Sequence, residues 1–166
     1  MTITAAQVKE LRQITNGPMM ECKKALVEAD GDIDKAIAIL RQNGIVKAAK
    51  KADRAANEGI IVADISDDGQ RGALVQVNCE TDFVSKNENF QAFVAELGKR
   101  GHDYGDGEMA DAVADDLAIK IQEIGENIVV GGNTRYTVEG IGVIGSYIHL
   151  GGKVGVLVEL GCGKAE

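Results

Sequence analysis

The sequence predicts an α+β fold, in which a three-helix module precedes a core of antiparallel strands and helices. Three observations support this class. Apolar residues recur at helical spacing in three successive stretches of residues 1–44. From residue 59 onward the periodicity changes to short β-rich runs separated by glycine-containing turns. A single proline in 166 residues and a hydrophobic content of 45% indicate ordinary globular material.

The first module, residues 1–44, is expected to hold three short helices. Thr4 and Gln7 match a capping box that opens the first helix, and "TNGP" ends it. Asp32 is the expected N-cap of the third helix, and Gly44 its expected stop. The expected core positions share helical spacing: Val8, Leu11, Ile14, Cys22, Ala25, Leu26, Ala29, Ile33, Ala36, Ile37 and Leu40.

Residues 45–58 are rich in alanine and lysine, which favours a partly exposed connecting helix. Residues 59–166 then form the α+β core domain. Its first two strands, "GIIVADIS" and "ALVQVNC", are joined by the hairpin signal "DDGQ". A helix with the apolar stripe Phe90, Phe93, Val94 and Leu97 follows, then an acidic loop and a helix ending near "IQEIGEN". Three further strands are expected at roughly 128–137, 143–149 and 154–160.

The last hairpin repeats the first. When Cys162 is aligned with Cys79, residues 142–162 match residues 59–79 in the positions of three glycines and of the alternating aliphatic side chains. The match predicts a duplicated hairpin-plus-helix unit. The helix that would follow the second copy is missing, because the sequence ends at Glu166. We therefore expect either that the chain is C-terminally short or that a partner covers the exposed face of the second hairpin.

The net charge of -8 argues against a nucleic-acid backbone or an anionic membrane as the main partner. The acidic excess lies entirely after residue 58, which supports a boundary there. The N-terminus has no apolar stretch typical of a secretion signal, and no run is long enough to span a membrane. A protein or a small molecule remains as the partner, and a cytoplasmic location is expected.

The cysteines and histidines do not indicate a catalytic or metal site. Cys22, Cys79 and Cys162 are odd in number and far apart, which favours reduced thiols in a cytosol. The two histidines, His102 and His149, are too few for a metal cluster, and no phosphate-binding loop is present. Buried, inert thiols are the favoured interpretation for Cys79 and Cys162. We expect no cofactor and no enzymatic activity.

Phe83 poses a choice between core and surface. If the helix begins at Thr81, Phe83 lies seven residues before Phe90 on the same stripe and is part of the core. Ser85 and Glu88 form a competing capping box that starts the helix later and leaves Phe83 exposed on its approach. An exposed phenylalanine beside the carboxylate of Asp82 is typical of an anchor for a partner's pocket.

Met19 and Met20 are adjacent and cannot both face the centre of a small bundle, because neighbouring helical residues point about 100° apart. At least one is expected at the surface. Flexible thioethers suit a binding face, and they equally suit gap-filling at the edge of the module.

Several motifs in the right order match a known family over essentially the whole chain. They are "MMECKKAL", "GDIDKAI", "KAAKKA", "VNCETDFVSKN", "IGENIVV" and "GSYIH". On these motifs the chain closely resembles the bacterial elongation factor Ts family, the guanine-nucleotide exchange factors of elongation factor Tu. The first module then resembles a ubiquitin-associated-type three-helix domain. The two glycines of "VVGGNTRY" depart from the arginines more typical of the family, which leaves that strand's contact with the partner open.

The resemblance implies where a partner is contacted. Asp82 and Phe83, within the segment from Thr81 to Val84, are expected to meet the nucleotide-binding domain of elongation factor Tu, with the ring wedged between two helices and the Mg²⁺ site disturbed. The other implied contacts fall into two groups. Ile124, Gly125 and His149 match positions in the same contact, and Arg12, Met19 and Met20 match the docking face of the small module.

These expectations lead to a non-enzymatic exchange factor that promotes GDP release from elongation factor Tu without binding nucleotide itself. The alternative is a binding module that docks the partner without exchange activity. A cysteine-dependent enzyme is a poorly supported third reading. If the chain ends at Glu166, weaker partner binding or reliance on a homodimer is expected.

Overall fold

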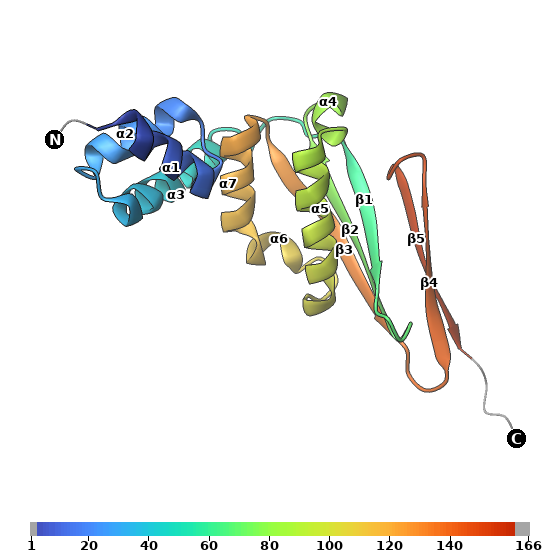
Figure 1. Cartoon of the computed structure of the whole chain (residues 1–166). Helices are drawn as coiled ribbons and strands as arrows, with labels where there is room; N and C mark the ends of the chain where they lie inside the picture. The colour runs from blue at the N-terminus through green and yellow to red at the C-terminus, as the bar shows by residue number, and fades with distance from the viewer. Residues whose placement is uncertain (1–2, 162–166) are drawn as a thin grey trace, which may run out of the picture. The chain divides into compact units, whose positions relative to one another are not determined.

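The computed structural model describes residues 3–161, which form the α+β architecture expected from the sequence (Figure 1). The chain divides into two compact units. The first comprises the residues up to Arg54 together with Ala114–Asn127, and the second comprises Ala55–Val113 together with the residues from Ile128 onward. Among the described residues, no helix is long and apolar enough to cross a membrane.

The first unit contains four helices within its described part: α1 (Ala5–Thr15), α2 (Met19–Glu28), α3 (Ile33–Ala49) and α7 (Ala114–Ile124). The predicted capping box at Thr4 and Gln7 and the Asp32 cap are both present. Buried side chains from the first three helices form their core: Val8, Leu11, Cys22, Ala25, Leu26, Ala29, Ala36 and Leu40. The likeness of α1–α3 to a ubiquitin-associated domain stays a prediction.

Two predictions about these helices are wrong. Ile14 was expected in the core but is exposed, because it is in the last turn of α1. Gly44 does not end α3, which continues to Ala49. Gly44 is buried against α7, where an added Cβ would lie 2.7 Å from Gln122 Oε1 and 3.4 Å from the Ala118 carbonyl oxygen. This glycine therefore allows two helices to approach closely.

The separate connecting helix predicted over residues 45–58 is not formed. The alanine- and lysine-rich sequence lengthens α3, turns follow from Lys50 to Arg54, and the first strand begins at Glu58. High helix propensity thus extended an existing helix, which avoids the unfavourable nucleation of a new one.

The second unit contains an antiparallel sheet of β1 (Glu58–Ile65), β2 (Arg71–Cys79) and β3 (Ile128–Thr137), in the order β1-β2-β3. The helical segments are α4 (Asp82–Ser85), α5 (Glu88–Arg100), the 3₁₀ turn η1 (Gly101–Asp103) and α6 (Met109–Ala112). Helix α5 packs against β1 and β2. Its Phe90, Val94 and Leu97 are buried, as are Val75 and Val77 of β2, so the predicted stripe forms this core.

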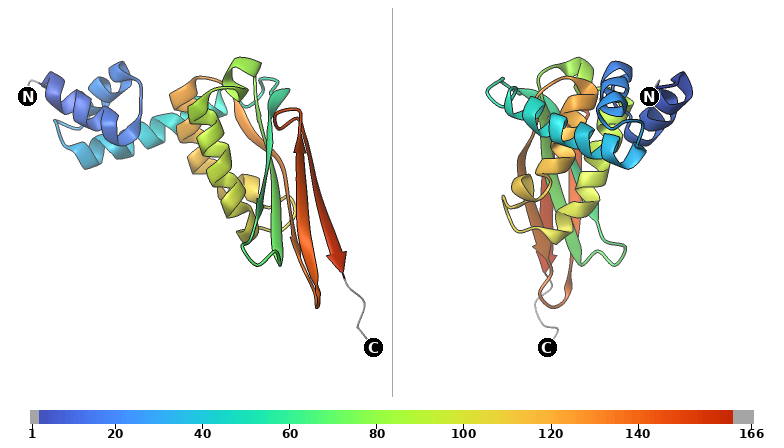
Figure 2. Two further views of the ribbon diagram at one scale, coloured as in Figure 1. Left: turned by 45° about the vertical axis from the view of Figure 1, so that its right-hand side comes forward. Right: turned by 90° about the vertical axis from the view of Figure 1, so that its left-hand side faces the viewer.

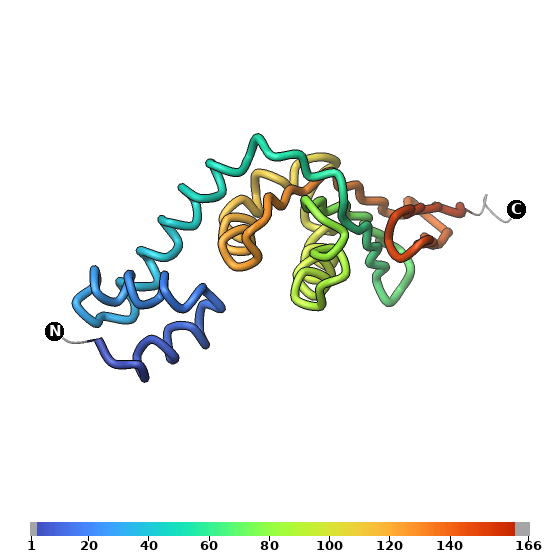
Figure 3. The backbone as a smooth tube through the Cα atoms, turned by 90° about the horizontal axis from the view of Figure 1, so that it is seen from above, coloured from blue at the N-terminus to red at the C-terminus, as the bar shows by residue number. Residues whose placement is uncertain are grey.

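The second hairpin pairs β4 (Gly142–His149) with β5 (Val154–Gly161). It lies beside the three-stranded sheet on the face opposite α5 (Figures 2 and 3). Its register repeats that of the first hairpin, since the pair Ile65↔Gly72 has its counterpart in Ile148↔Gly155. Residues 142–161 thus share the register of the first hairpin, while the duplication of a hairpin-plus-helix unit stays a prediction and Cys162 lies outside the described residues.

Equivalent atoms of the two hairpins contact each other reciprocally. The Ile61 amide donates to the Gly152 carbonyl at 2.6 Å, and the equivalent Ile144 amide donates to the Gly69 carbonyl at 2.8 Å. A Cβ at Gly155 would lie 2.5 Å from Ile61 Cγ2, and one at Gly72 would lie 2.6 Å from Ile144 Cγ2. The duplicated hairpins are thus packed with approximate two-fold symmetry.

The outward face of the second hairpin is apolar and exposed. Its exposed side chains include Val143, Tyr147, Val156, Val158 and Leu160. In the first hairpin, the counterparts of the last three are Ala73, Val75 and Val77, which are buried. The face that is buried in the core in the first hairpin is therefore exposed at the surface in the second hairpin.

Candidate functional site

The segment from Thr81 to Val84 forms a single helical turn between β2 and α5. Thr81 is the N-cap of α4, and its Oγ1 accepts a hydrogen bond from the Val84 amide at 3.4 Å. The buried Ser85 hydroxyl donates to the Asp82 carbonyl oxygen at 2.9 Å. The backbone that carries Asp82 and Phe83 is therefore fixed from both ends of the turn.

Phe83 is 81% exposed, so the interpretation that places it at the surface is confirmed and the core alternative is wrong. The capping box that favours this interpretation is not formed as predicted. Helix α5 does begin at Glu88, but its N-cap is Asn87, whose Oδ1 accepts from the amides of Asn89 and Phe90. Ser85 belongs to α4 instead of capping α5. A short helix followed by a second cap holds the aromatic ring in solvent.

Asp82 is paired with Lys86, with 2.7 Å between Oδ2 and Nζ. The hydrogen bond from Lys86 and its positive charge lower the pKa of Asp82, and Lys153 adds a smaller effect of the same sign. The same pair raises the pKa of Lys86. Asp82 is thus a carboxylate at neutral pH, directly beside the exposed ring.

Replacing Lys86 with methionine is expected to raise the pKa of Asp82 back toward its ordinary value of 3.8, because the main cause of the lowering is removed. Because the folded-state pKa is depressed, the pair stabilises the fold above the unfolded pKa and loses this contribution as the pH falls through the folded value. Carboxyl ¹³C NMR titration of Asp82 in both proteins measures the change. Lys99→Met, at an exposed position of α5, is the control and leaves the Asp82 titration unchanged.

His149 ends β4 at the same end of the second unit as α4. Its carbonyl oxygen accepts from the amides of Gly152 and Lys153, at 3.2 and 3.1 Å. Lys153 in turn binds Glu58 Oε2 at 2.5 Å and the Gly59 carbonyl at 3.2 Å. The electrostatic effect of Lys153 on Asp82 links this turn to α4. The structure therefore brings His149 and the Asp82–Phe83 pair to one end of the unit.

Arg12, Met19 and Met20 belong to the first unit. Pro18 precedes α2 as its N-cap residue, so the two methionines occupy the first turn of that helix. Met19 is 56% exposed and Met20 is 60% exposed. At least one of them was expected at the surface, and both are. Arg12 is exposed on α1. These side chains are accessible, and their role in docking stays a prediction.

Ile124 is the last residue of α7, and Gly125 follows it in the same unit. Gly125 has φ +92°, a conformation that favours glycine. Its carbonyl oxygen accepts a hydrogen bond from Lys51 Nζ. Asn127, which is buried, donates from Nδ2 to the carbonyl oxygens of Ala52 and Arg54, at 3.4 and 2.8 Å. The segment after α3 and the loop after α7 are therefore tied together.

Asn127→Ala is expected to lower the free energy of unfolding by about 1–3 kcal/mol, because two carbonyl oxygens lose a buried donor. Urea denaturation monitored by circular dichroism measures this. The matched control is Asn43→Ala at an exposed position of α3, where the change should stay within about 0.5 kcal/mol. Equal effects of the two substitutions would show that the Asn127 bonds carry no stability.

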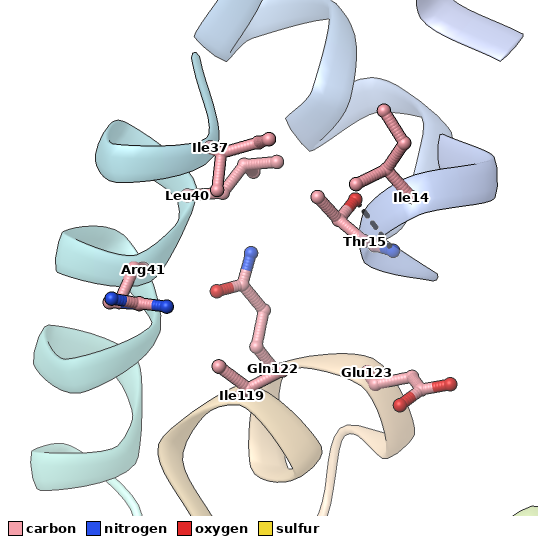
Figure 4. Close-up of a pocket in the computed structure, with 9 residues that line it drawn as sticks. Ile14, Thr15, Ile37, Leu40, Arg41, Ile119, Gln122 and Glu123 are labelled. Carbon is pink, nitrogen blue, oxygen red and sulfur yellow. Dashed lines mark hydrogen bonds between the residues drawn. The ribbon is translucent and has the colours of Figure 1, made fainter. Parts of the chain in front are cut away.

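A small pocket of about 210 Å³ lies in the first unit between α1, α3 and α7 (Figure 4). Its walls include Ile14, Ile37, Leu40 and Ile119, and the Gln122 side chain points into it. The exposed Ile14 is thus accounted for as pocket lining. None of the site residues predicted from the sequence lines this pocket.

The described residues contain no group of three or more side chains suited to hold a metal ion. Cys22 and Cys79 are buried thiols that form no disulfide in this part of the chain. Cys79 donates to the Thr81 carbonyl at 3.2 Å, which adds to the anchoring of α4. The predicted burial is thus confirmed for Cys79, whereas Cys162 lies outside the described residues.

The predicted site residues divide between the two units. Thr81, Asp82, Phe83, Val84 and His149 belong to the second unit, and the others belong to the first. Sequence reasoning missed Lys86, which pairs with Asp82, and Asn127, which ties the segment after α3 to the loop after α7. The geometry defines an α+β protein with exposed side chains on rigid backbone, the arrangement that proteins use for contacts with one another.

A family model for elongation factor Ts matches residues 80–166. Elongation factor Ts of Nitratiruptor sp. is 48% identical over all of this chain and 57% of its own length. The Nautilia profundicola protein is 49% identical over 96% of this chain and 55% of its own length. The chain belongs to the elongation factor Ts family. It spans somewhat more than half the length of these relatives.

Proposed function

We propose that this chain is a translation elongation factor that promotes GDP release from elongation factor Tu. The observation that carries the proposal is the 81% exposure of Phe83 on a backbone pinned by Thr81 and Ser85. A rigid aromatic side chain loses little conformational entropy on insertion into a partner. Asp82 beside it supplies a charge that fixes the orientation of the contact.

The physical requirement on such a factor is differential affinity. It must bind the nucleotide-free partner more tightly than the nucleotide-bound partner, and by thermodynamic linkage it then weakens nucleotide binding by the same factor. Insertion of the Phe83 ring into a gap that opens only when the partner's Mg²⁺ site is distorted supplies this difference. No bond is made or broken by the factor, so no catalytic group is needed.

The remaining contacts enlarge the interface. His149 lies at the same end of the second unit as Phe83, and it is placed to meet the same domain of the partner. Met19, Met20 and Arg12 form the docking face of the first unit. Ile124 and Gly125 add a contact from the C-terminal end of α7. The net charge of -8 disfavours nucleotide itself as a ligand.

The test is stopped-flow fluorescence of labelled GDP bound to elongation factor Tu. Addition of the purified, folded chain should accelerate GDP release in a saturable manner. Unchanged release, with circular dichroism showing a folded chain, would refute exchange activity. Tight binding by calorimetry without faster release would favour the second candidate, a docking module. This candidate is supported by the position of half of the proposed contact residues in the first unit.

Homodimer formation is a further proposal, supported by the exposed apolar face of β4 and β5. Sedimentation equilibrium on the purified chain tests it. A Val158→Lys variant, which places a charge on this face, should shift a dimer toward monomer. A monomer for the parent chain at all concentrations would exclude this proposal and leave the exchange proposal untouched.

A further inference from the structure

Tyr147 and His149 lie on the same face of β4, because side chains two residues apart in a strand share a face. The Tyr147 hydroxyl is 2.9 Å from His149 Nδ1. The two rings are stacked, with centroids 5.6 Å apart and an angle of 22° between their planes. Both side chains are exposed, and Tyr147 is 60% accessible. The contact is therefore not part of a buried core.

The backbone of His149 is fixed independently of this contact. Its carbonyl oxygen accepts hydrogen bonds from two amides of the β4–β5 turn, and Lys153 ties that turn to Glu58 and Gly59. The Tyr147 contact then fixes the ring. An exposed histidine would otherwise sample several rotamers, so this arrangement holds one of them before any partner arrives.

The hydrogen-bond chemistry also sets which nitrogen carries the proton. A phenol O–H is a stronger proton donor than a neutral imidazole N–H, which favours the arrangement in which the Tyr147 hydroxyl donates and Nδ1 accepts. Neutral His149 then carries its proton on Nε2. That nitrogen presents an N–H group to an acceptor oxygen of a partner.

We propose that Tyr147 is a positioning residue that holds His149 as a preorganised Nε2–H donor for an acceptor oxygen of the partner. This inference rests on the proposed exchange function, because it assigns the partner-facing chemistry of a residue in the same contact. The general reason is that fixing a side chain in its bound geometry lowers the entropic loss on binding.

Tyr147→Phe is the critical variant, because it keeps the stacked ring and removes only the hydroxyl. In the free protein, ¹⁵N NMR at pH 8 should show the Nε2–H tautomer of His149 in the parent and a mixture of tautomers in the variant. In the exchange assay, the half-saturating concentration of the factor should rise about 2- to 10-fold. The maximal rate should stay the same, since the Phe83 contact is intact.

The matched control is Tyr136→Phe, which removes an exposed hydroxyl from β3. It should change neither the His149 tautomer nor the half-saturating concentration. In a His149→Ala background, Tyr147→Phe should have no further effect on exchange, because it acts only through the histidine. Both tyrosine variants should melt at the parent temperature.

The proposal is overturned if Tyr147→Phe leaves the tautomer unchanged, or if its effect on exchange persists without His149. A proton on Nδ1 in the parent protein would also overturn it. If the parent chain does not accelerate GDP release at all, the proposed function fails, while the NMR measurement on the free protein still decides whether Tyr147 sets the state of His149.

Discussion

Phe83→Ala should remove most of the stimulation of GDP release, with a loss equivalent to about 2 kcal/mol or more, as for a typical interface anchor. This corresponds to a fall of about 30-fold in the apparent second-order rate constant of exchange. The melting temperature should stay within a few degrees of the parent, because the 81% exposed ring makes little contribution to the core. Stopped-flow kinetics and thermal melting measure the two quantities.

Phe90→Ala is the matched control on the same segment. Phe90 is fully buried, so its truncation should lower the free energy of unfolding by about 3–5 kcal/mol. Any loss of exchange in this variant should follow the fraction of unfolded protein. If Phe83→Ala destabilises the chain as strongly as Phe90→Ala, the ring is not the exposed anchor that the structure shows.

Gly72→Val and Gly155→Val should each destabilise the second unit, by about 1–3 kcal/mol or more. The added side chain at Gly72 would collide with Ile144, and the one at Gly155 with Ile61. Because these contacts are related by the approximate two-fold symmetry of the hairpins, the two losses should be similar. Urea denaturation of each variant gives the free energies.

Gly145→Val provides the control, since an added Cβ there has no neighbour within 4 Å and valine favours a strand. Its stability should stay within about 0.5 kcal/mol of the parent. A loss at Gly145 as large as at Gly72 would mean that any β-branched residue is harmful in these strands. The similar losses of Gly72→Val and Gly155→Val would then not support the reciprocal packing of the two hairpins.

The elements of this fold were largely predictable because their signals are local. Thr4, Asp32 and the apolar stripes indicate helices, and the repeated glycines indicate two equivalent hairpins. The errors arose where a glycine or a hydroxyl had a tertiary role. Gly44 allows α3 to pack closely on α7, which no pattern within α3 reveals. Ser85 and Glu88 match a capping box, but Asn87 lies closer to the helix start and caps it.

The candidate site was predicted mainly through the family resemblance. The exposure of Phe83 was one of two alternatives, because the spacing of the apolar residues was compatible with both a core and a surface position. The residues that fix the site could not be found in this way. Lys86 and Tyr147 pair with near neighbours, but such pairs are too common in sequences to single out. Asn127 acts on carbonyl oxygens more than 70 positions away, so only the folded chain reveals it.

The segment Ala114–Asn127, which contains α7, belongs to the first unit, although the residues on both sides of that segment belong to the second. During vectorial synthesis on the ribosome, α1–α3 emerge early and have their own core, but the surface around Gly44 has no covering helix until residue 124 has been made. The nascent N-terminal helices therefore complete their packing only after most of the polypeptide has been synthesised. Deletion of Ala114–Asn127 would leave the surface of α3 around Gly44 uncovered.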